Sequence, residues 1–278
     1  TAAEIITKAR GASVLITKEL SVDRACVRAL PRSVRLICEA GTGFNNVDVK
    51  AARERGIAVC NAAAYSTDAV AQLVVTFLLD LSTSLSAQQS ALRSKSGDAS
   101  HFFSDPPMHF FELRGKVLGL VGGSGAIGTR VGEIARCLGM TVLDHSRSTE
   151  TTLEEVLAQS DFVSLHCPLT PETRHLINER TLAIMKPSAF LINTARGAIV
   201  DEEDLLRALD NGTIAGAALD VQSPEPPPPD SPLYGHPSIL LTPHLGWKRL
   251  ETRQRLLARV ADNLRAFVAN EPLPNLVN

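Results

Sequence analysis

The fold of this chain is decided by the run Gly115-Lys116-Val117-Leu118-Gly119-Leu120-Val121-Gly122-Gly123-Ser124-Gly125-Ala126-Ile127-Gly128. It reads as a short apolar strand that ends in a glycine-rich turn, and residues 129–138 continue it as a helix that Gly139 closes. Gly123, Gly125 and Gly128 match G-x-G-x-x-G where the strand passes into the helix. Because glycine lacks a side chain, a phosphate can approach this backbone and accept bonds from the N–H groups that begin the helix. The run therefore predicts a dinucleotide-binding turn; the alternative is a tight turn without a ligand.

Strand and helix patterns alternate on both sides of this run, which is typical of parallel α/β sheets. We expect strands at 13–16, 35–38, 57–60, 117–121, 141–145, 162–166, 189–193, 214–220 and 239–242. The later strands are enough for a doubly wound parallel sheet of the Rossmann type. A shift to Ser, Asp and Pro over 82–107 predicts two domains, which we place at 1–90 plus 267–278 and at 91–266. A long final helix, 251–269, is expected to return to the first domain.

The bulk composition argues against several kinds of protein. The 278 residues carry a net charge of −2, so nothing favours binding to nucleic acid or to anionic lipid. The mean hydropathy is +0.05, and no apolar run approaches the ~20 residues of a membrane span. The five cysteines are widely spaced, which argues against a bound metal and against disulfides. We therefore expect a soluble, cytoplasmic protein without a metal.

Polar residues follow the later strands, at the edge where open α/β sheets bind ligands. Arg196 follows one strand, Glu225 comes shortly after the next, and His244 follows the last. Arginine can clamp a carboxylate and polarise a carbonyl group. Histidine can protonate an alkoxide as hydride arrives, and a neighbouring glutamate raises the pKa of its imidazole. These three side chains are therefore suited to the reduction of a 2-keto acid.

Three motifs follow the glycine-rich run: N-T-A-R-G at 193–197, A-L-D-V-x-x-x-E-P at 218–226 and T-P-H-x-G-W at 242–247. In this order they resemble the D-isomer-specific 2-hydroxyacid dehydrogenases, and the resemblance covers nearly the whole chain. The spelling S-P-E-P-P-P at 223–228 with T-P-H-L-G-W is most like the hydroxypyruvate/glyoxylate reductase (glycerate dehydrogenase) branch. The resemblance implies an NAD(P)-dependent oxidoreductase that acts on small 2-keto and 2-hydroxy acids. It also implies a smaller, flavodoxin-like substrate domain beside the Rossmann domain.

The resemblance assigns roles to individual residues. Arg196, Glu225 and His244 are the expected catalytic residues. The backbone of Gly41, Thr42 and Gly43 is expected to cradle the substrate carboxylate, and Trp247 to line the pocket. The cofactor is expected at a larger set, in which Asp220 holds the nicotinamide carboxamide: Gly123, Gly125, Ala126, Ile127, Gly128, Ser146, Arg147, Ser148, Cys167, Pro168, Thr173, Thr194, Ala195, Asp220 and Gly246.

Two features depart from the family pattern. The family reads I-G-x-G-x-I-G, whereas residues 121–128 are one residue longer. Where NAD-preferring members carry an aspartate after the second strand of this domain, this chain has Ser146, followed by Arg147 and Ser148. A carboxylate would repel the 2′-phosphate of NADP, and Ser with Arg would bind it. We therefore favour NADP(H). NAD(H) stays open, because Asp144 lies two residues earlier on the same strand face.

Two other functions remain open from the sequence. One is a 3-phosphoglycerate dehydrogenase, whose members can carry Arg before an A-G-T-G turn; this chain has Glu39 there, which is unfavourable for a phosphate. The other is a non-catalytic NAD(H)-sensing protein like the corepressors that share this fold.

Aromatic residues gather around the end of the 82–107 segment, which we expect to be a linker with a surface arm. They are Phe102, Phe103, Phe110 and Phe111. We expect them to form the contact of a homodimer, with a local core as the alternative.

Overall fold

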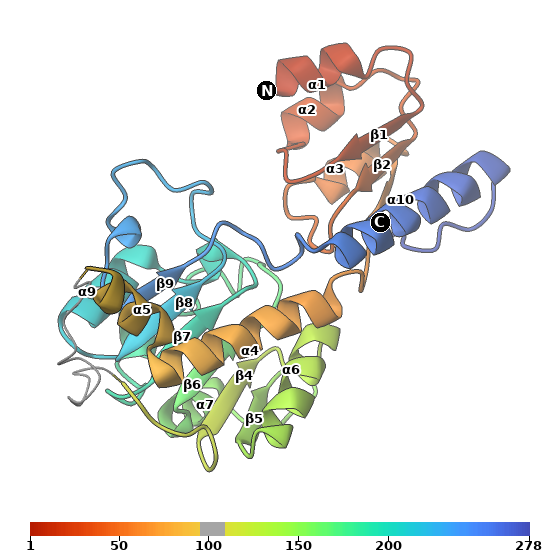
Figure 1. Ribbon diagram of the computed structural model, residues 1–278. Coiled ribbons are helices and arrows are strands. Elements are labelled where there is room, and N and C mark those ends of the chain that lie inside the picture. The colour runs from red at the N-terminus through yellow and green to blue at the C-terminus, as the bar shows by residue number, and fades with distance from the viewer. Residues whose placement is uncertain (95–108) are drawn as a thin grey trace. The chain divides into compact units, whose positions relative to one another are not determined.

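The computed structural model describes residues 1–94 and 109–278, and its contacts divide the chain into two units. The smaller unit comprises Thr1–Ser66 and Trp247–Asn278, and the larger one comprises Thr67–Gly246 (Figure 1). The sequence pattern places the divisions at 90/91 and 266/267 instead. The first division differs because α4 (Thr67–Thr83) packs in the core of the larger unit. The second differs because α10 (Leu250–Ala269) packs in the smaller unit, although most of this helix lies before residue 267.

The larger unit is built on a six-stranded parallel sheet. Its strands are β4 (Val117–Val121), β5 (Thr141–His145), β6 (Phe162–Leu165), β7 (Phe190–Asn193), β8 (Gly216–Leu219) and β9 (Ile239–Leu241). Their spatial order is β5-β4-β6-β7-β8-β9, so the order reverses where β4 lies beside β6. In such sheets ligands bind at the carboxyl ends of the strands near this reversal. The predicted doubly wound sheet is confirmed.

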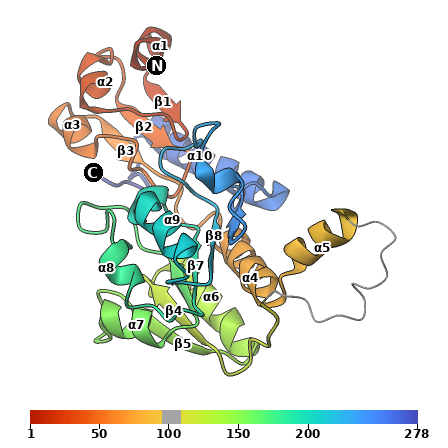
Figure 2. The same cartoon turned by 90° about the vertical axis from the view of Figure 1, so that its left-hand side faces the viewer.

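Side chains that alternate along these strands supply two cores, one on each face of the sheet. Leu118, Leu120, Phe162 and Ile192 pack against α4 and α6 (Ala126–Cys137). On the opposite face, strand side chains pack against α7 (Leu153–Gln159), α8 (Glu179–Leu182) and α9 (Glu202–Asp210); they are Val121, Val163, Leu165, Leu191, Ala217 and Leu219. Figures 1 and 2 show the helices on both faces. This burial on both faces explains why the strands read as continuous apolar runs.

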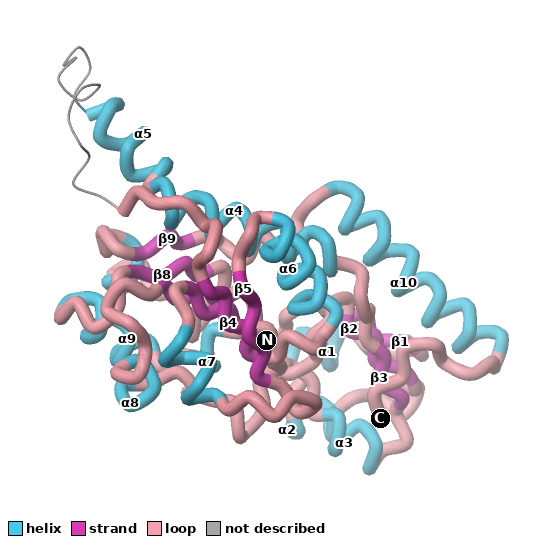
Figure 3. The backbone as a smooth tube through the Cα atoms, turned by 90° about the horizontal axis from the view of Figure 1, so that it is seen from below, coloured by secondary structure: helices cyan, strands magenta, loops and turns pink. Residues whose placement is uncertain are grey.

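The smaller unit contains a three-stranded parallel sheet in the order β1-β2-β3. The strands are β1 (Val14–Thr17), β2 (Leu36–Glu39) and β3 (Ala58–Cys60), and the helices between and before them are α1 (Ala2–Lys8), α2 (Arg24–Ala29) and α3 (Val49–Glu54). Figure 3 shows the backbone coloured by secondary structure, with these three strands labelled. Leu256 and Val260 of α10 pack with Leu36, Cys38 and Cys60, so the C-terminal segment completes the core of this unit.

Several element ends differ from the sequence pattern. In the smaller unit, α2 begins after Asp23, whose carboxylate accepts a bond from the Cys26 N–H. The expected linker contains α5 (Leu85–Ser94), which the pattern missed because Ser and Gln replace most apolar residues there. Phe102 and Phe103 lie outside the described residues. Phe110 is 69% exposed, whereas Phe111 packs against Phe162 and Phe190 in the core.

Among residues 1–94 and 109–278, no single helix has the length and apolarity of a membrane span, although the bent pair α4 and α5 meets those criteria together. No group of three or more His, Cys, Asp or Glu side chains in the same residues is arranged to hold a metal ion.

Candidate active site

The glycine-rich turn lies at the carboxyl end of β4 and is held from three sides. Gly122 has a φ of +87°, and a Cβ on it would lie 2.7 Å from the Cys167 nitrogen. A Cβ on Gly128 would lie 2.5 Å from the Gly123 Cα, so α6 packs directly on the turn. The turn bonds to β5 as well: the Gly122 N–H donates to the His145 carbonyl at 2.7 Å. Only glycine fits these positions, because an added methyl group would meet backbone atoms.

Two observations fit this edge to a dinucleotide. Gly125 is the N-cap residue of α6 and makes no side-chain cap, so the first N–H groups of that helix face an open turn that can bind a pyrophosphate. After β7, the buried Thr194 hydroxyl has no hydrogen-bond partner within the described protein. A buried hydroxyl without a partner is costly, and a bound ligand would satisfy it. The residues present therefore fit the NAD(P) that the fold implies.

The segment after β5 carries the residues expected at the adenosine end of the cofactor. Ser146 directly follows β5, and its hydroxyl donates to Asp144 Oδ2 at 3.2 Å and lies 3.1 Å from the Ser148 hydroxyl. Arg147 is exposed beside them. Asp144 itself accepts a 2.7 Å bond from the Gly123 N–H through Oδ1. Both carboxylate oxygens of Asp144 are thus engaged within the protein.

The loop after β6 carries a further group of expected cofactor residues. The Thr173 hydroxyl donates to the Pro168 carbonyl at 2.7 Å, which closes this loop on itself. Burial raises the pKa of the Cys167 thiol to about 11, so it stays neutral and unreactive at pH 7. Burial also lowers the pKa of His166 to about 4, and its Nε2 bonds to the Ser164 hydroxyl at 3.0 Å. His166 is therefore neutral and structural.

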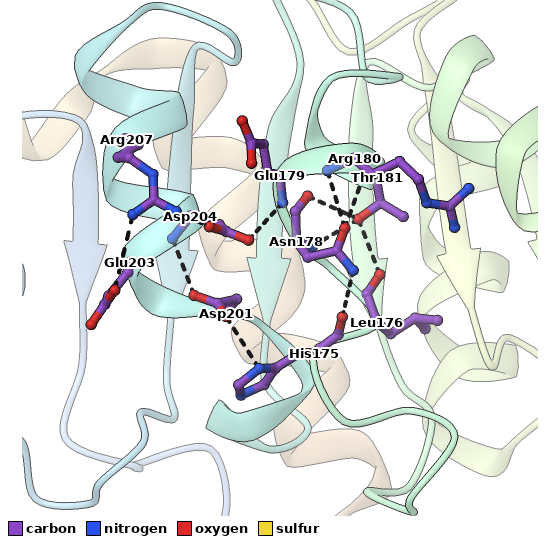
Figure 4. Close-up of polar contacts among 10 residues, drawn as sticks. All are labelled: His175, Leu176, Asn178, Glu179, Arg180, Thr181, Asp201, Glu203, Asp204 and Arg207. Atoms are coloured by element: carbon purple, nitrogen blue, oxygen red, sulfur yellow. Dashed lines mark hydrogen bonds and ion pairs between the residues drawn. The ribbon is translucent and has the colours of Figure 1, made fainter.

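Figure 4 shows how this loop is fastened to the segment after β7. The His175 Nδ1 lies 3.1 Å from an oxygen of Asp201, the N-cap of α9. The His175 N–H donates to the Ala198 carbonyl at 2.9 Å. At the start of α8, the Glu179 N–H donates to Asp204 at 2.8 Å. These bonds hold the loop after β6 and the segment that leads into α9 as one piece.

The turn after β7 is shaped by Asn193, which the sequence analysis did not single out. Its side-chain Nδ2 donates to the Arg196 carbonyl at 2.9 Å, and its side-chain Oδ1 accepts from the Ala195 N–H at 3.0 Å. Arg196 is half-buried and donates to the Ala195 carbonyl at 2.6 Å. A Cβ on Gly197 would lie 2.0 Å from the carbonyl carbon and oxygen of Gln222. The turn that carries Arg196 therefore packs directly against the loop that leads to Glu225.

His244 and Glu225 form a close pair. The Nδ1 of His244 lies 2.5 Å from Oε1 of Glu225, and the side chains are 22% and 34% exposed. Because a carboxylate can only accept, Nδ1 donates and the other ring nitrogen, Nε2, faces away from this bond. His244 has a φ of +47°, which is unusual for a residue with a side chain. Such backbone strain persists only where the surroundings hold it.

Asp220 holds the backbone around His244 in this conformation. It is 2% exposed, and Oδ1 accepts bonds from the Thr242 hydroxyl at 2.6 Å and the Leu245 N–H at 2.8 Å. Oδ2 accepts from the Gly246 N–H at 2.9 Å. Asp220 therefore braces the segment on both sides of His244. This bracing was not evident from the sequence, which gave Asp220 and Gly246 only cofactor contacts.

Arg196, Glu225 and His244 follow β7, β8 and β9, which are neighbouring strands, and they lie at the same edge of the sheet. A cavity of about 660 Å³ lies elsewhere, at the amino ends of these strands, where Phe190, Gly216 and Ser238 line it. The cavity is therefore separate from this group of residues.

The residues expected at the substrate carboxylate lie in the smaller unit. The Gly41 carbonyl accepts from the Ala62 N–H at 2.9 Å, and the Thr42 carbonyl accepts from the Asn61 amide at 2.7 Å. These bonds fasten the turn at 41–43 to the segment after β3. Trp247 has a buried indole N–H without a partner in the described protein, and the Lys18 ammonium lies 3.8 Å above its ring.

Glu39 is 1% exposed and precedes this turn. Burial raises the pKa of its carboxyl group, and bonds from the Asn46 amide at 2.8 Å and the Glu19 N–H at 3.3 Å oppose that rise. The carboxyl group is turned into the protein, and a Cβ on Gly41 would lie 3.2 Å from its Oε1.

Comparison with known proteins gives a consistent result. Residues 75–246 match the model for the NAD-binding domain of D-isomer specific 2-hydroxyacid dehydrogenases. The chain is 35% identical over 287 residues to a hydroxypyruvate reductase of Blautia hydrogenotrophica, covering 99% of this chain and 88% of that protein. It is 39% identical over 299 residues to a glyoxylate reductase of Aeropyrum pernix, covering 99% and 85% respectively.

A solved structure shows the same likeness in three dimensions. It is an NADPH-dependent glyoxylate/hydroxypyruvate reductase from Sinorhizobium meliloti in complex with NADP and malonate. The TM-score is 0.89 at 30% identity, with 100% of this chain and 87% of that chain covered.

Proposed function

The chain belongs to the D-isomer-specific 2-hydroxyacid dehydrogenase family, and on that premise we propose that it reduces hydroxypyruvate or glyoxylate with NADPH as the favoured reductant. The observation that carries this proposal is the 2.5 Å pair between His244 and Glu225. A histidine held in this way at the carboxyl edge of a dinucleotide-type sheet has the features of a proton donor in carbonyl reduction.

Each of the three expected catalytic residues has its own role in the reduction. Arg196 binds the substrate carboxylate and draws electron density from the neighbouring carbonyl group. His244 gives the proton on Nε2 to the oxygen that becomes the alcohol. Glu225 accepts the bond from Nδ1, which fixes the orientation of the ring and leaves Nε2 free to face the substrate. The backbone of the turn at 41–43 would cradle the substrate carboxylate, and Trp247 would line the pocket.

The cofactor would lie along the edge described above. The turn at 122–125 and the start of α6 would bind its pyrophosphate, and the Thr194 hydroxyl and Asp220 would hold its nicotinamide end. When bound, the reduced nicotinamide supplies the hydride that forms the new C–H bond. Ser146 and Arg147 would bind the 2′-phosphate; the proposal for NADPH is supported by Arg147, whose exposed guanidinium can pair with a phosphate at this end of the cofactor.

The direct test measures turnover of the purified chain with hydroxypyruvate, glyoxylate and pyruvate, each with NADPH and with NADH. We expect hydroxypyruvate or glyoxylate with NADPH to give the highest kcat/KM. His244→Ala should lower kcat by about 10²–10⁴, because the proton must then come from water. His236→Ala is a matched control, since His236 also pairs with a carboxylate, Asp210 at 3.4 Å, but precedes β9 at the opposite edge of the sheet. Near-normal kcat in His244→Ala would reject His244 as the proton donor.

The same measurements separate the rival functions. A 3-phosphoglycerate dehydrogenase would prefer the phosphorylated keto acid, and this chain carries Glu39 where such enzymes can carry an arginine before the turn. A cofactor-sensing protein would bind NAD(H) tightly with negligible turnover of every acid.

We also propose a cytoplasmic homodimer. The five thiols are free and far apart in the sequence, which suits a reducing compartment. The exposed Phe110, and Leu85 at 57% exposure, support a subunit contact near α5.

A further inference from the structure

The glycine-rich turn is longer than the family pattern and must satisfy the hydrogen bonding of its additional backbone groups. One additional residue brings one additional peptide N–H into a turn that must also present its first helical N–H groups to a ligand. The Gly122 N–H continues the sheet by donating to His145, and the Gly125 N–H donates to the Gly122 carbonyl at 3.2 Å. The Gly123 N–H lies between them and needs a partner of its own.

Asp144 provides that partner. It lies on β5 directly across from Leu120, one strand away from the turn. Its Oδ1 accepts the Gly123 N–H at 2.7 Å. Glycine permits this approach, since a Cβ at residue 123 would meet Oδ1 of Asp144 and would lie 2.8 Å from the Leu120 Cβ. Oδ2 accepts from the Ser146 hydroxyl, so the carboxylate joins the end of β5 to the turn after β4.

The position of Gly123 in turn sets the start of α6. The Thr129 hydroxyl donates to the Gly123 carbonyl at 3.3 Å, and the Gly128 backbone packs against the Gly123 Cα. Gly123 is therefore fixed by Asp144 on one side and by the first turn of α6 on the other. Any displacement of Gly123 moves the N–H groups at the start of α6.

We propose that Asp144 is a positioning residue for the pyrophosphate site: its carboxylate holds the longer turn in the conformation that binds the cofactor, and it does not read the adenosine ribose. The inference rests on the proposed function, because it assumes that a dinucleotide binds at this turn. It assigns discrimination between NADP and NAD to Ser146 and Arg147 alone.

A ribose reader and a turn brace respond differently to substitution. A carboxylate that binds the ribose 2′-OH favours NADH and repels NADPH, so its removal weakens NADH selectively. A brace acts on the pyrophosphate that both cofactors share, so its removal weakens both by the same factor.

The experiment measures the Kd of NADH, NADPH and ADP-ribose by titration calorimetry for wild type, Asp144→Ala and Asp144→Asn. We expect Asp144→Ala to weaken all three ligands by about tenfold, the loss of one charge-assisted bond. Asp144→Asn should recover to within about threefold of wild type, because its amide oxygen can still accept the Gly123 N–H. In steady-state kinetics Asp144→Ala should raise the KM for both cofactors by more than it lowers kcat, a split that a general loss of structure would not give.

Asp161→Ala serves as the matched control. Asp161 also accepts a backbone N–H, that of Val117 at 2.8 Å, but at the amino end of β4. Its substitution should lower the unfolding temperature without changing any of the three Kd values. Hydrogen exchange of the Gly123 amide, measured without cofactor, should accelerate in Asp144→Ala and not in Asp161→Ala.

The outcomes separate the two proposals. Wild type that binds neither dinucleotide overturns the proposed function and this inference together. Wild type that binds, with Asp144→Ala binding equally well or losing only NADH, overturns the assignment of Asp144 alone.

Discussion

Adding one methyl group at Gly197 should disable the site without removing any polar side chain from it. In Gly197→Ala the new Cβ would lie 2.0 Å from the carbonyl carbon and oxygen of Gln222, whereas ordinary contact begins at 3.4 Å. The two backbone segments must therefore separate by about 1.4 Å, the difference between these distances. Since one segment carries Arg196 and the other leads to Glu225, the separation changes the relative placement of both.

The expected effects follow from the size of that displacement. Overpacking of this kind costs about 1–3 kcal/mol of folding free energy. A misplacement of about 1 Å at a reacting centre costs about 10²-fold in rate. We therefore expect kcat to fall about 10²-fold while the unfolding temperature falls by only several degrees, read from steady-state kinetics and thermal unfolding. Gly235→Ala is the control, because a Cβ there meets nothing within 4 Å and its φ is −121°. Wild-type kcat in Gly197→Ala would refute the argument that this packing sets the site.

Three further outcomes follow from single groups. Arg147→Ala should weaken NADPH about ten- to a hundredfold and leave NADH within about twofold by calorimetry; equal losses would exclude Arg147 as the phosphate-binding residue. Because burial lowers the pKa of His166 from 6.5 to about 4, the folded state resists protonation and loses stability as the pH falls from 6.5 to 4. Urea unfolding should show wild type losing about 3 kcal/mol more than His166→Gln across that window, and parallel losses would contradict it. Phe110→Ser should shift the molar mass measured by light scattering from dimer toward monomer, whereas an unchanged dimer would place the subunit contact elsewhere.

The sequence was informative where side-chain burial and glycine dominate the local structure. The strands of the larger unit are apolar runs that end in glycine or polar residues, so their approximate positions could be predicted, and β4 to β6 were found within a residue. Asp201 also caps α9 as its sequence indicates, because a carboxylate before an acidic first turn suits a helix N-terminus. The sequence signals of secondary structure are weaker where the composition is polar, and for that reason α5 was predicted to be part of a linker.

The hydrogen bonds that brace the site could not be predicted from the sequence. Asp144 and Asp220 were both considered for contacts with the cofactor, and the sequence did not show that their oxygens also accept bonds from the protein's own backbone and hydroxyl groups. Such bonds depend on the path of the turn after the next strand, and no spacing rule gives that path. The division of the chain was likewise set by the side chains against which α4 and α10 pack, which periodicity alone does not identify.

The bracing by Asp220 has a consequence for how this edge of the protein can vary. Since the backbone on either side of His244 is tied to the end of β8, the largely exposed, proline-rich stretch at 226–230 is not needed to keep that histidine in place. Insertions, deletions or randomised libraries in this stretch should leave the proton donor where it is, provided that Glu225 is retained. Sequence changes that arise by natural drift or by laboratory selection should therefore be tolerated in this stretch.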